Sequence, residues 1–545
     1  MSGGTERRLT HARAWRNGAI AVVIAAGTIA AGAVAPASAG TSSGAKARDV
    51  TIKIAGIGLD GQPVSLANNQ AALWPLSAPA NNTYPIYANF DNEYRVLPGK
   101  YLVAGYVPVG SGQFQNSVVV QRVTISKSET ITLDSQGAKP FSVALTGASA
   151  TEQGQYADLC VTGGSGRQSW ATSFLPSYVG GDTQYVKAFA DKNLALLYHG
   201  FYSGDAGVNY DVAGYHAGGL PAGATYSSKA ADLAKLTVAA RAGTVAGQQW
   251  ALSLDWQYGA ANCGANFNPD AEALALPGSV IQYVSPGELS VGAFGLSPNG
   301  FSYDQNLRVA GGRSYTATFN NAVAGPYTGT PTINSGLLCS MPGAIYGTPG
   351  SVGWANDAVG TVTLRRGAQS LGRRGFGDFT TCFRVNHKTG WYTMTQSAHH
   401  AAAAGVTPAT LSTSISLSWH FFIPALGAFE YGSDVQLPAT LTTFAPAGLN
   451  MSNQVPPGQT SIVMHVIRNG GYSADFALNY RLRSVRVQYS TDGGHYWQTA
   501  SVSARRGYWL VTVPSSGSAV SLRSTVTDVK GDSTVETIYN AYGVS

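Results

Sequence analysis

The sequence predicts an all-β fold in which several β-sandwich domains follow one another in tandem. Short runs alternate apolar and polar residues, as at Val485, Val487 and Tyr489, with the period of a strand that buries one face. Turn-forming residues are abundant, with 66 Gly and 25 Pro. Charged residues make up only 11% of the 545 residues, which suits extracellular sandwiches whose surfaces use hydroxyls and amides. A chain of this length is expected to hold several domains.

The first 39 residues are predicted to be a secretory signal peptide. Four arginines precede the apolar residues 20–34, and residues 37–39 read Ala-Ser-Ala, a small-residue cleavage site. The alternative of a membrane anchor is disfavoured, because the apolar run is short and rich in Gly for a spanning helix. No later apolar run is long enough to cross a bilayer. We therefore expect a secreted chain that begins with a Ser/Gly/Ala linker at residues 40–48.

The charge balance argues against nucleic acid as a partner. The 34 Lys and Arg outnumber the 28 Asp and Glu, and removal of the signal, with its four Arg and one Glu, leaves a formal charge of about +3. A nucleic-acid binder normally shows a clearly basic balance and a basic face.

The four cysteines are an even number in a chain expected to be exported, which predicts two disulfides. Three pairings are possible. We expect Cys160–Cys263 and Cys339–Cys382, since each pair then lies within one predicted domain. No Cys-x-x-Cys or nearby Cys/His spacing supports the alternative of a zinc site, so no metal or other cofactor is predicted.

Residues 48–140 are predicted to form the first β-sandwich. Residues 50–54 alternate as a strand, and residues 94–103 contain a Pro-Gly turn. Residues 118–125 and 129–133 supply further strands that close the sheet.

Residues 141–270 are predicted to form an irregular β-rich domain. Residues 194–198 and 250–256 have the pattern of strands. Residues 229–242 have some helical character, and a strand at residues 233–239 is the alternative.

Four titratable residues of this second domain are candidate metal ligands by residue type. They are His199, Asp205, Asp211 and His216, in a segment rich in Gly and Tyr. Their spacing matches no ligand set, so we expect loop residues of a β-fold rather than a metal site.

Residues 271–444 are predicted to form a third sandwich domain, with alternating strands at 390–394 and 412–421. Trp391 and Trp419 are expected in its core rather than on a ligand platform, because large aromatic side chains are usually buried.

Four arginines of the third domain offer a basic patch for an anionic polymer. They are Arg365, Arg366, Arg373 and Arg374. The more general interpretation, the solvated faces of a hairpin, is preferred.

A linker at residues 446–457 is predicted to lead to the last β-domain, residues 458–545. A Ser-x-Asp-x-Gly-x-x-Trp pattern runs from Ser490 to Trp497, and it predicts a hairpin whose Ser and Asp satisfy backbone groups of the turn. One copy cannot build a propeller, which needs repeated blades, so the motif is predicted to be structural.

Several segments resemble the non-catalytic regions of large secreted subtilisin-like peptidases of actinobacteria. The segments are residues 94–103, 276–284, 311–326, 360–365, 485–497, 521–528 and 531–542. The resemblance implies a carboxypeptidase-regulatory-like sandwich at residues 48–140 and an immunoglobulin-like domain at 458–545, and it favours the strand at 233–239. The family's protease unit has no counterpart in this sequence, so its activity and catalytic residues are not carried over.

No set of residues with catalytic spacing is found, and the chain is expected not to be an enzyme. A subtilisin-like Asp, His and Ser set is absent, as are a Gly-x-Ser-x-Gly elbow and a His-Glu-x-x-His motif. A pair of carboxylates for glycoside hydrolysis leaves no short signature and stays open as an alternative.

The sequence therefore predicts a secreted binding or scaffolding protein, whose partner is a cell-surface glycan, a cell-wall polymer or another secreted protein. Three tryptophans near Gly or polar residues are candidate stacking platforms for a sugar: Trp170, Trp256 and Trp354. One alternative is an accessory chain that docks to a secreted peptidase and modulates it. The other is an unrecognised hydrolase.

Overall fold

A computed structural model describes residues 49–545, apart from 67–69, 77–85, 87, 89–92, 110–115, 163–168, 173–183, 243–248, 259–262, 297–300, 327–329, 335, 341–345, 349–351, 356–357, 377–379, 386–387, 402–408, 424–434 and 469–480. The predicted signal peptide and the linker at 40–48 lie outside the described residues. Residues 49–545 form one compact unit. No helix among the described residues is long and apolar enough to span a membrane.

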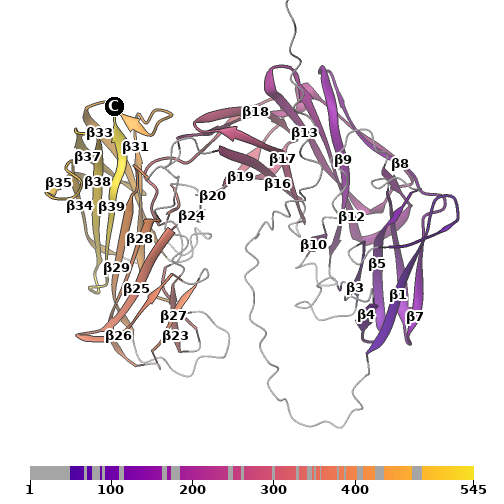
Figure 1. Ribbon diagram of the computed structural model, residues 1–545, viewed down its shortest axis with the longest axis horizontal. Helices are drawn as coiled ribbons and strands as arrows, with labels where there is room; N and C mark the ends of the chain where they lie inside the picture. The colour runs from indigo at the N-terminus through magenta and orange to yellow at the C-terminus, as the bar shows by residue number, and fades with distance from the viewer. Residues whose placement is uncertain are drawn as a thin grey trace, which may run out of the picture. The chain divides into compact units, whose positions relative to one another are not determined.

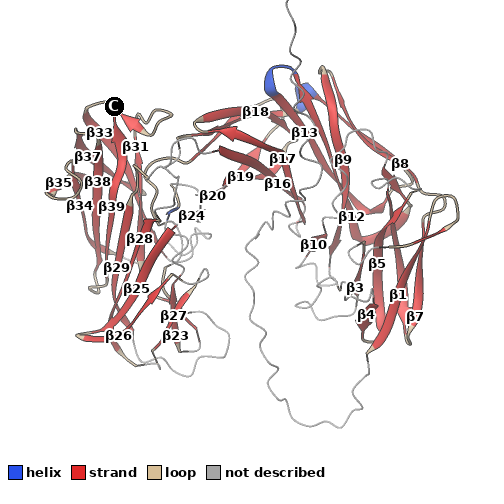
Figure 2. Ribbon diagram, in the orientation of Figure 1, coloured by secondary structure: helices blue, strands red, loops and turns tan. Residues whose placement is uncertain are grey.

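The described chain is built almost entirely from β-strands, as predicted (Figure 2). Helix is confined to short 3-10 segments in the part of the chain that the structure describes, among them the single turns η1 (Asp205–Gly207) and η2 (Ala230–Asp232). The stretch at 229–242 is therefore helical for one turn only, and the strand expected there is present as β15 (Ala234–Ala240). Its apolar residues alternate with Lys235, Thr237 and Ala239, so that one face is buried.

Two sheets enclose the N-terminal core. The first four-stranded sheet is centred on β1 (Val50–Ile57), which pairs with β2 (Pro63–Val64), β4 (Glu93–Val96) and β7 (Glu129–Asp134). The six-stranded sheet has the order β14 (Ala224–Lys229), β8 (Lys139–Thr146), β11 (Gln184–Val186), β6 (Asn116–Ile125), β5 (Gly99–Pro108) and β3 (Ala71–Pro75). Ile54 of the first sheet packs with Val103 of the second, so the pair is a sandwich.

Two further sheets follow in the middle of the chain. The seven-stranded sheet has the order β10 (Ser169–Thr172), β9 (Ala150–Thr162), β12 (Phe189–Gly204), β13 (Val208–Leu220), β18 (Gly278–Val284), β15 and β21 (Ser314–Phe319). The five-stranded sheet has the order β17 (Cys263–Ala275), β16 (Gln249–Tyr258), β19 (Gly287–Leu296), β20 (Phe301–Val309) and β24 (Val352–Ala355). The seven-stranded sheet shares a core with the six-stranded sheet through Leu196 and with the five-stranded sheet through Leu236.

The C-terminal part is organised around one nine-stranded sheet (Figure 1). Its order is β26 (Gln369–Gly375), β25 (Ala358–Arg366), β28 (Gly390–His400), β29 (Ser414–Ile423), β39 (Ser533–Val544), β38 (Ala519–Asp528), β34 (Leu482–Ser490) and β35 (Gln498–Thr499), and β32 (Gln454–Val455) also pairs with β39.

Two smaller sheets cover one face of the nine-stranded sheet. The disulfide sheet consists of β27 (Thr381–Arg384), β23 (Leu337–Ser340), β22 (Thr332–Asn334) and β30 (Val435–Gln436). The C-terminal four-stranded sheet consists of β31 (Thr440–Pro446), β33 (Gly458–Arg468), β37 (Tyr508–Ser515) and β36 (Ser501–Arg505). Trp419 lies in the core beneath the first and Ile538 in the core beneath the second.

The predicted domain boundaries do not separate these sheets. Strand β11 at 184–186 pairs with β6 at 116–125, across the boundary expected at residue 140. Strand β29 at 414–423 pairs with β39 at 533–544, across the boundary expected near residue 450. These boundaries are corrected, because pairing between strands far apart in the sequence has no local sequence signal.

The segment predicted as a linker, 446–457, is held in place by polar contacts. Asn453 donates hydrogen bonds from Nδ2 to the carbonyl oxygens of Ala242 and Asn320, at 3.0 and 2.8 Å. Its Oδ1 accepts one from the N–H of Ala322 at 2.8 Å. Arg241 donates to the carbonyl oxygens of Leu449 and Asn450. The segment therefore connects the middle and C-terminal sheets rather than serving as a free tether.

The disulfide predictions are confirmed in part. Cys339 and Cys382 face each other across β23 and β27 and are bonded, with their Cα atoms 4.0 Å apart. Cys160 is also in a disulfide. Its expected partner, Cys263, begins β17, and the side chain of Cys263 lies outside the described residues.

Candidate ligand-binding site

The predicted stacking platform at Trp256 is wrong. Trp256 is a residue of β16, and its side chain is fully buried. Its ring and that of His199 meet edge to face with centroids 5.3 Å apart, and its Nε1 donates to the carbonyl oxygen of Ser285. Trp256 lies in the core because the alternation of β16 places it in phase with Leu252 and Leu254. Trp170 and Trp354 lie in β10 and β24, but their side chains are outside the described residues.

We expect Trp256→Ala to destabilise the fold by about 3–5 kcal/mol, because removing a buried Trp leaves a cavity as well as losing buried area. Urea unfolding followed by intrinsic fluorescence measures this loss. Tyr215→Ala is the control, since Tyr215 is 37% exposed on the neighbouring strand β13 and is expected to cost far less. An unchanged unfolding midpoint for Trp256→Ala would contradict the buried placement.

His199 and Asp211 lie on adjacent strands, not in the loop that was predicted. His199 belongs to β12 and Asp211 to β13, where Asp211 pairs with Phe201. His199 Nδ1 lies 3.9 Å from Asp211 Oδ1, and both side chains are buried in the core. Burial lowers the pKa of His199 to about 3. The described residues contain no group of three or more potential metal ligands.

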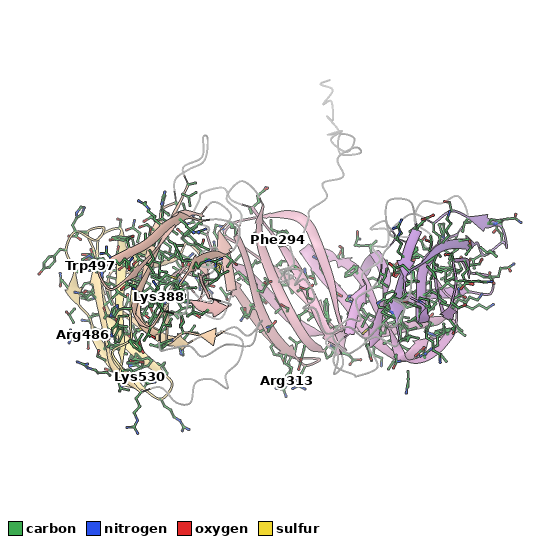
Figure 3. All side chains as sticks on the ribbon, turned by 90° about the horizontal axis from the view of Figure 1, so that it is seen from below. Phe294, Arg313, Lys388, Arg486, Trp497 and Lys530 are labelled. Carbon is green, nitrogen blue, oxygen red and sulfur yellow. A yellow bond between two sulfur atoms is a disulfide. The ribbon has the colours of Figure 1, made fainter. Side chains whose placement is uncertain are left out.

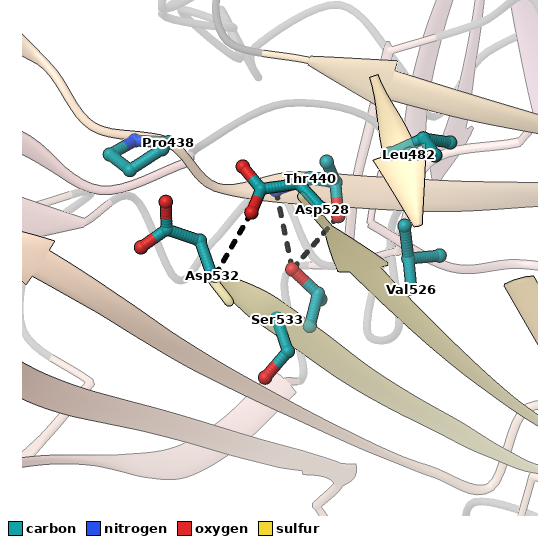
Figure 4. Close-up of a pocket in the computed structure, with 8 residues that line it drawn as sticks. Pro438, Thr440, Leu482, Val526, Asp528, Asp532 and Ser533 are labelled. Atoms are coloured by element: carbon teal, nitrogen blue, oxygen red, sulfur yellow. Dashed lines mark hydrogen bonds between the residues drawn. The ribbon is translucent and has the colours of Figure 1, made fainter. Parts of the chain in front are cut away.

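A small hollow of about 10 Å³ lies at the turn between β38 and β39 (Figure 4). Two carboxylates line it: Asp528 bonds the turn, and Asp532 bonds the neighbouring strand β29. Asp528 Oδ1 accepts from the N–H groups of Lys530 and Asp532, at 2.8 and 3.0 Å. Asp532 Oδ1 accepts from the N–H of Phe422 at 2.9 Å, and burial raises the pKa of Asp532. Both acids are buried and hydrogen-bonded to backbone groups, and they do not flank an open cleft as a pair for glycoside hydrolysis would.

The Ser-x-Asp-x-Gly-x-x-Trp turn is structural, as predicted. Ser490 Oγ accepts from the N–H of Gly494 at 2.9 Å and donates to Asp492 Oδ1 at 2.6 Å. Asp492 Oδ1 also accepts from the N–H of Tyr496, and the hydrogen bond from Ser490 lowers the pKa of Asp492. Trp497 Nε1 donates to the carbonyl oxygen of Gly494 at 2.9 Å. The Ser, Asp and Trp side chains of the motif therefore hydrogen-bond within the turn itself.

The outer face of the nine-stranded sheet, opposite the two smaller sheets, carries part-exposed and exposed side chains along its central strands. Along β28 the inward Tyr392 and Met394 are buried, and the outward Thr393 and Thr395 are part-exposed. We call this surface the hydroxyl face. One row of outward residues across seven strands is Arg373, Thr363, Thr395, Ser418, Val535, Thr525 and Arg486. A second row is Arg365, Thr393, His420, Ser533, Thr527 and Ser484.

The hydroxyls of this face are ordered by hydrogen bonds between strands. Thr395 and Ser418 are joined at 3.1 Å, and Thr361 and Ser397 at 3.3 Å. At strand spacings of about 4.8 Å, a row across seven strands extends for about 29 Å. The face is therefore long enough for several units of a polymer.

Aromatic side chains stand at one end of the hydroxyl face. The ring of Trp391 stacks on His420, with centroids 4.8 Å apart and planes 6° apart, and meets Phe422 edge-on at 5.4 Å. Trp391 is 37% exposed and Phe422 39%. The prediction that Trp391 lies in the core is thus wrong, because alternation places it in phase with Thr393 and Thr395. That phase is visible in the sequence and could have revealed this cluster.

A second aromatic group lies farther along the hydroxyl face. The guanidinium of Arg523 lies over the ring of Trp497 at 4.0 Å, and Trp497 meets the ring of Tyr539 edge-on at 6.2 Å. Arg523 Nε also donates to Thr537 Oγ1 at 3.1 Å. Figure 3 labels Trp497 and Arg486 in this part of the chain. A second set of cationic and aromatic groups thus lies on β38, on β39 and between β34 and β35.

Comparison with known proteins identifies no family for this chain. No family model matches it, and no curated protein matches it. Among solved structures, the N-terminal eight Ig domains of the Down Syndrome Cell Adhesion Molecule match at 8% identity, over 90% of this chain and 73% of that one, with a TM-score of 0.14. A Streptococcal ancillary pilin matches at 11% identity, over 50% of this chain and 99% of that one, with a TM-score of 0.12. Trypsin-activated alpha-2-macroglobulin from Escherichia coli matches at 7% identity, over 90% and 49%, with a TM-score of 0.14. At these scores the three likenesses assign neither a family nor a function.

Proposed function

We propose that the chain is a secreted, non-catalytic binding protein whose ligand is an extracellular glycan polymer. The observation that carries the proposal is the exposed aromatic cluster of Trp391, His420 and Phe422 at the end of an ordered hydroxyl face. Exposed rings offer the flat apolar surface on which the C–H face of a sugar packs, and flanking hydroxyls hydrogen-bond to its OH groups. The disulfide between Cys339 and Cys382 supports an oxidising compartment.

The rigidity of the site supports the same function. Thr393 Oγ1 lies 2.9 Å from His420 Nδ1, so the imidazole is held flat beneath Trp391. Both residues stand on paired strands rather than on loops. A preorganised platform loses little side-chain entropy on binding, which favours repeated weak contacts with a long polymer.

We expect Trp391→Ala to weaken binding to insoluble glycan by about ten-fold or more, the effect of removing a central aromatic contact. Retention on purified cell wall and on insoluble polysaccharides, measured as binding isotherms, tests this. Tyr215→Ala is the matched control, since Tyr215 has the same 37% exposure on the seven-stranded sheet. Equal binding by wild type and Trp391→Ala would reject the hydroxyl face as the site. Recovery of the wild type with a secreted peptidase, and not with glycan, would reject the function.

A further inference from the structure

We propose that the ligand of the hydroxyl face is an acidic polysaccharide whose carboxylates are bound by Arg365 and Arg373. This inference rests on the proposed function, because it assigns the chemical class of the glycan at the same site. The juxtaposition that carries it is a pair of arginines with no acidic partner among the described residues, one of them beside the exposed ring of Trp391, on strands whose two acids are buried.

The charge of the nine-stranded sheet is one-sided. Its strands contain seven arginines, Arg365, Arg366, Arg373, Arg374, Arg483, Arg486 and Arg523, and two acids, Asp528 and Glu536. Both acids are buried, Asp528 at 4% exposure and Glu536 at 0%. The outward rows described above therefore present cations and hydroxyls to solvent and no carboxylate. Such a surface attracts anions over the distance of a Debye length, about 8–10 Å at physiological salt.

Arg365 and Arg373 are available for a ligand. Both are exposed and stand on the outer side of the β25–β26 hairpin, where Arg373 lies opposite Thr363. The ion pairs of the described residues involve Lys53, Arg122, Lys187 and His199, and none involves these two arginines. Arg365 Nη2 donates one hydrogen bond, to the carbonyl oxygen of Ala368 at 2.8 Å. Most of the donors on both guanidinium groups remain open to solvent.

The positions of these groups match a charged sugar. Arg365 pairs directly with Thr393, and Trp391 is two residues farther along the same strand, β28. Such diagonal neighbours on a sheet have Cβ atoms about 7–8 Å apart, within reach of an Arg side chain and an aromatic ring. A sugar ring packed on Trp391 therefore brings a carboxylate on its edge to the guanidinium. The planar fork of arginine binds a carboxylate through two parallel hydrogen bonds, which a lysine does not offer.

Acidic polysaccharide fits these observations better than nucleic acid, the other polyanion that combines with arginine and aromatic rings. Between Arg373 and Arg486 the first row consists of Ser and Thr apart from Val535, and these hydroxyls suit the many hydroxyls of a sugar chain. The whole chain is only weakly basic for its length, whereas a nucleic-acid binder relies on many phosphate contacts.

The test compares polygalacturonate with its methyl ester, which has the same backbone without the charge. For wild type, we expect isothermal titration to show binding to polygalacturonate that weakens as salt is raised, and at least ten-fold weaker binding to the ester. The double variant Arg365→Gln/Arg373→Gln is expected to lose the preference for the acid. The control Arg505→Gln/Arg506→Gln removes two exposed arginines from the C-terminal four-stranded sheet and its turn, and is expected to behave as wild type.

The outcomes separate this inference from the proposed function. Equal binding of both polymers, unaffected by Arg365→Gln/Arg373→Gln but lost in Trp391→Ala, overturns the acidic ligand and leaves a glycan-binding face. Binding of single-stranded DNA as tightly as polygalacturonate at the same salt overturns the polysaccharide. Failure to bind any polysaccharide, charged or neutral, overturns both.

Discussion

Raising the pH from 5 to 8 is expected to destabilise the C-terminal sheets, and Glu536→Gln is expected to abolish most of this effect. Glu536 lies on β39 with its carboxyl group fully buried between the nine-stranded sheet and the C-terminal four-stranded sheet. It accepts a hydrogen bond from the N–H of Thr442 at 3.0 Å, and none of the ion pairs of the described residues involves it. Burial raises the pKa of Glu536 to about 8.

The sign of this change in stability with pH follows from proton linkage. Between the ordinary value of 4.5 and about 8, the folded chain holds a proton on Glu536 that the unfolded chain has released. Stability is therefore full below pH 4.5 and falls as the pH rises through this window. One pKa unit corresponds to about 1.4 kcal/mol, so the loss approaches about 5 kcal/mol. A glutamine has no proton to release, so the stability of the Glu536→Gln variant should not follow this trend.

Urea unfolding at pH 5 and pH 8 tests the prediction, with pulsed hydrogen exchange and mass spectrometry to assign each transition to its peptides. The comparison is between wild type and Glu536→Gln, so other titrating groups cancel. Glu129→Gln is the control, because Glu129 is part-exposed on β7. The buried, protonated Glu536 would be rejected if both proteins lost the same stability between the two pH values.

Lowering the pH is expected to destabilise the sheets that precede the C-terminal part, through His199 of β12. Burial lowers the pKa of His199 from its ordinary 6.5 to about 3, and the acidic side chain that faces it, Asp211 at 3.9 Å, does not outweigh this burial. Between pH 6.5 and 3 the unfolded chain gains a proton on this imidazole that the folded chain does not accept. Stability is therefore lost as the pH falls, by up to about 5 kcal/mol.

His199→Gln keeps a polar side chain at the site and removes its titration. We expect this variant to be less stable than wild type at pH 7.5 but to lose less on transfer to pH 4.5, in the peptides of β9, β12 and β13. His216→Gln is the control, since His216 is only part-buried on β13. The same acid loss in His199→Gln as in wild type would show that other groups cause it.

The positions of the strands were predictable from the sequence, whereas the neighbouring strand with which each one pairs was not. The alternation at 390–394, 412–421 and 485–489 identified β28, β29 and β34, because period two is a local property. The pairing of β29 with β39 joins segments more than a hundred residues apart, and no short pattern encodes such a contact. The domain boundaries failed for this reason.

The candidate site was partly visible in the sequence. The four arginines of the β25–β26 hairpin were identified as a possible basic patch, and the structure shows which of them face outward. Trp391 was assigned to the core by its size, although its alternation with Tyr392 and Met394 indicated the opposite face. Trp256 was assigned to a ligand by its polar neighbours in sequence, although its strand phase indicated the core. For both tryptophans, strand phase was the better guide than residue type.

The central place of β39 in the nine-stranded sheet has a consequence for biogenesis. Strand β39 lies between β29 and β38, so residues 414–423 have an open edge until residues 533–544 arrive. Because a polypeptide is synthesised from its N-terminus, this edge stays unpaired while the intervening residues, about a hundred in number, are synthesised. Maturation of this half is therefore expected to be a late and slow event, governed by long-range chain closure.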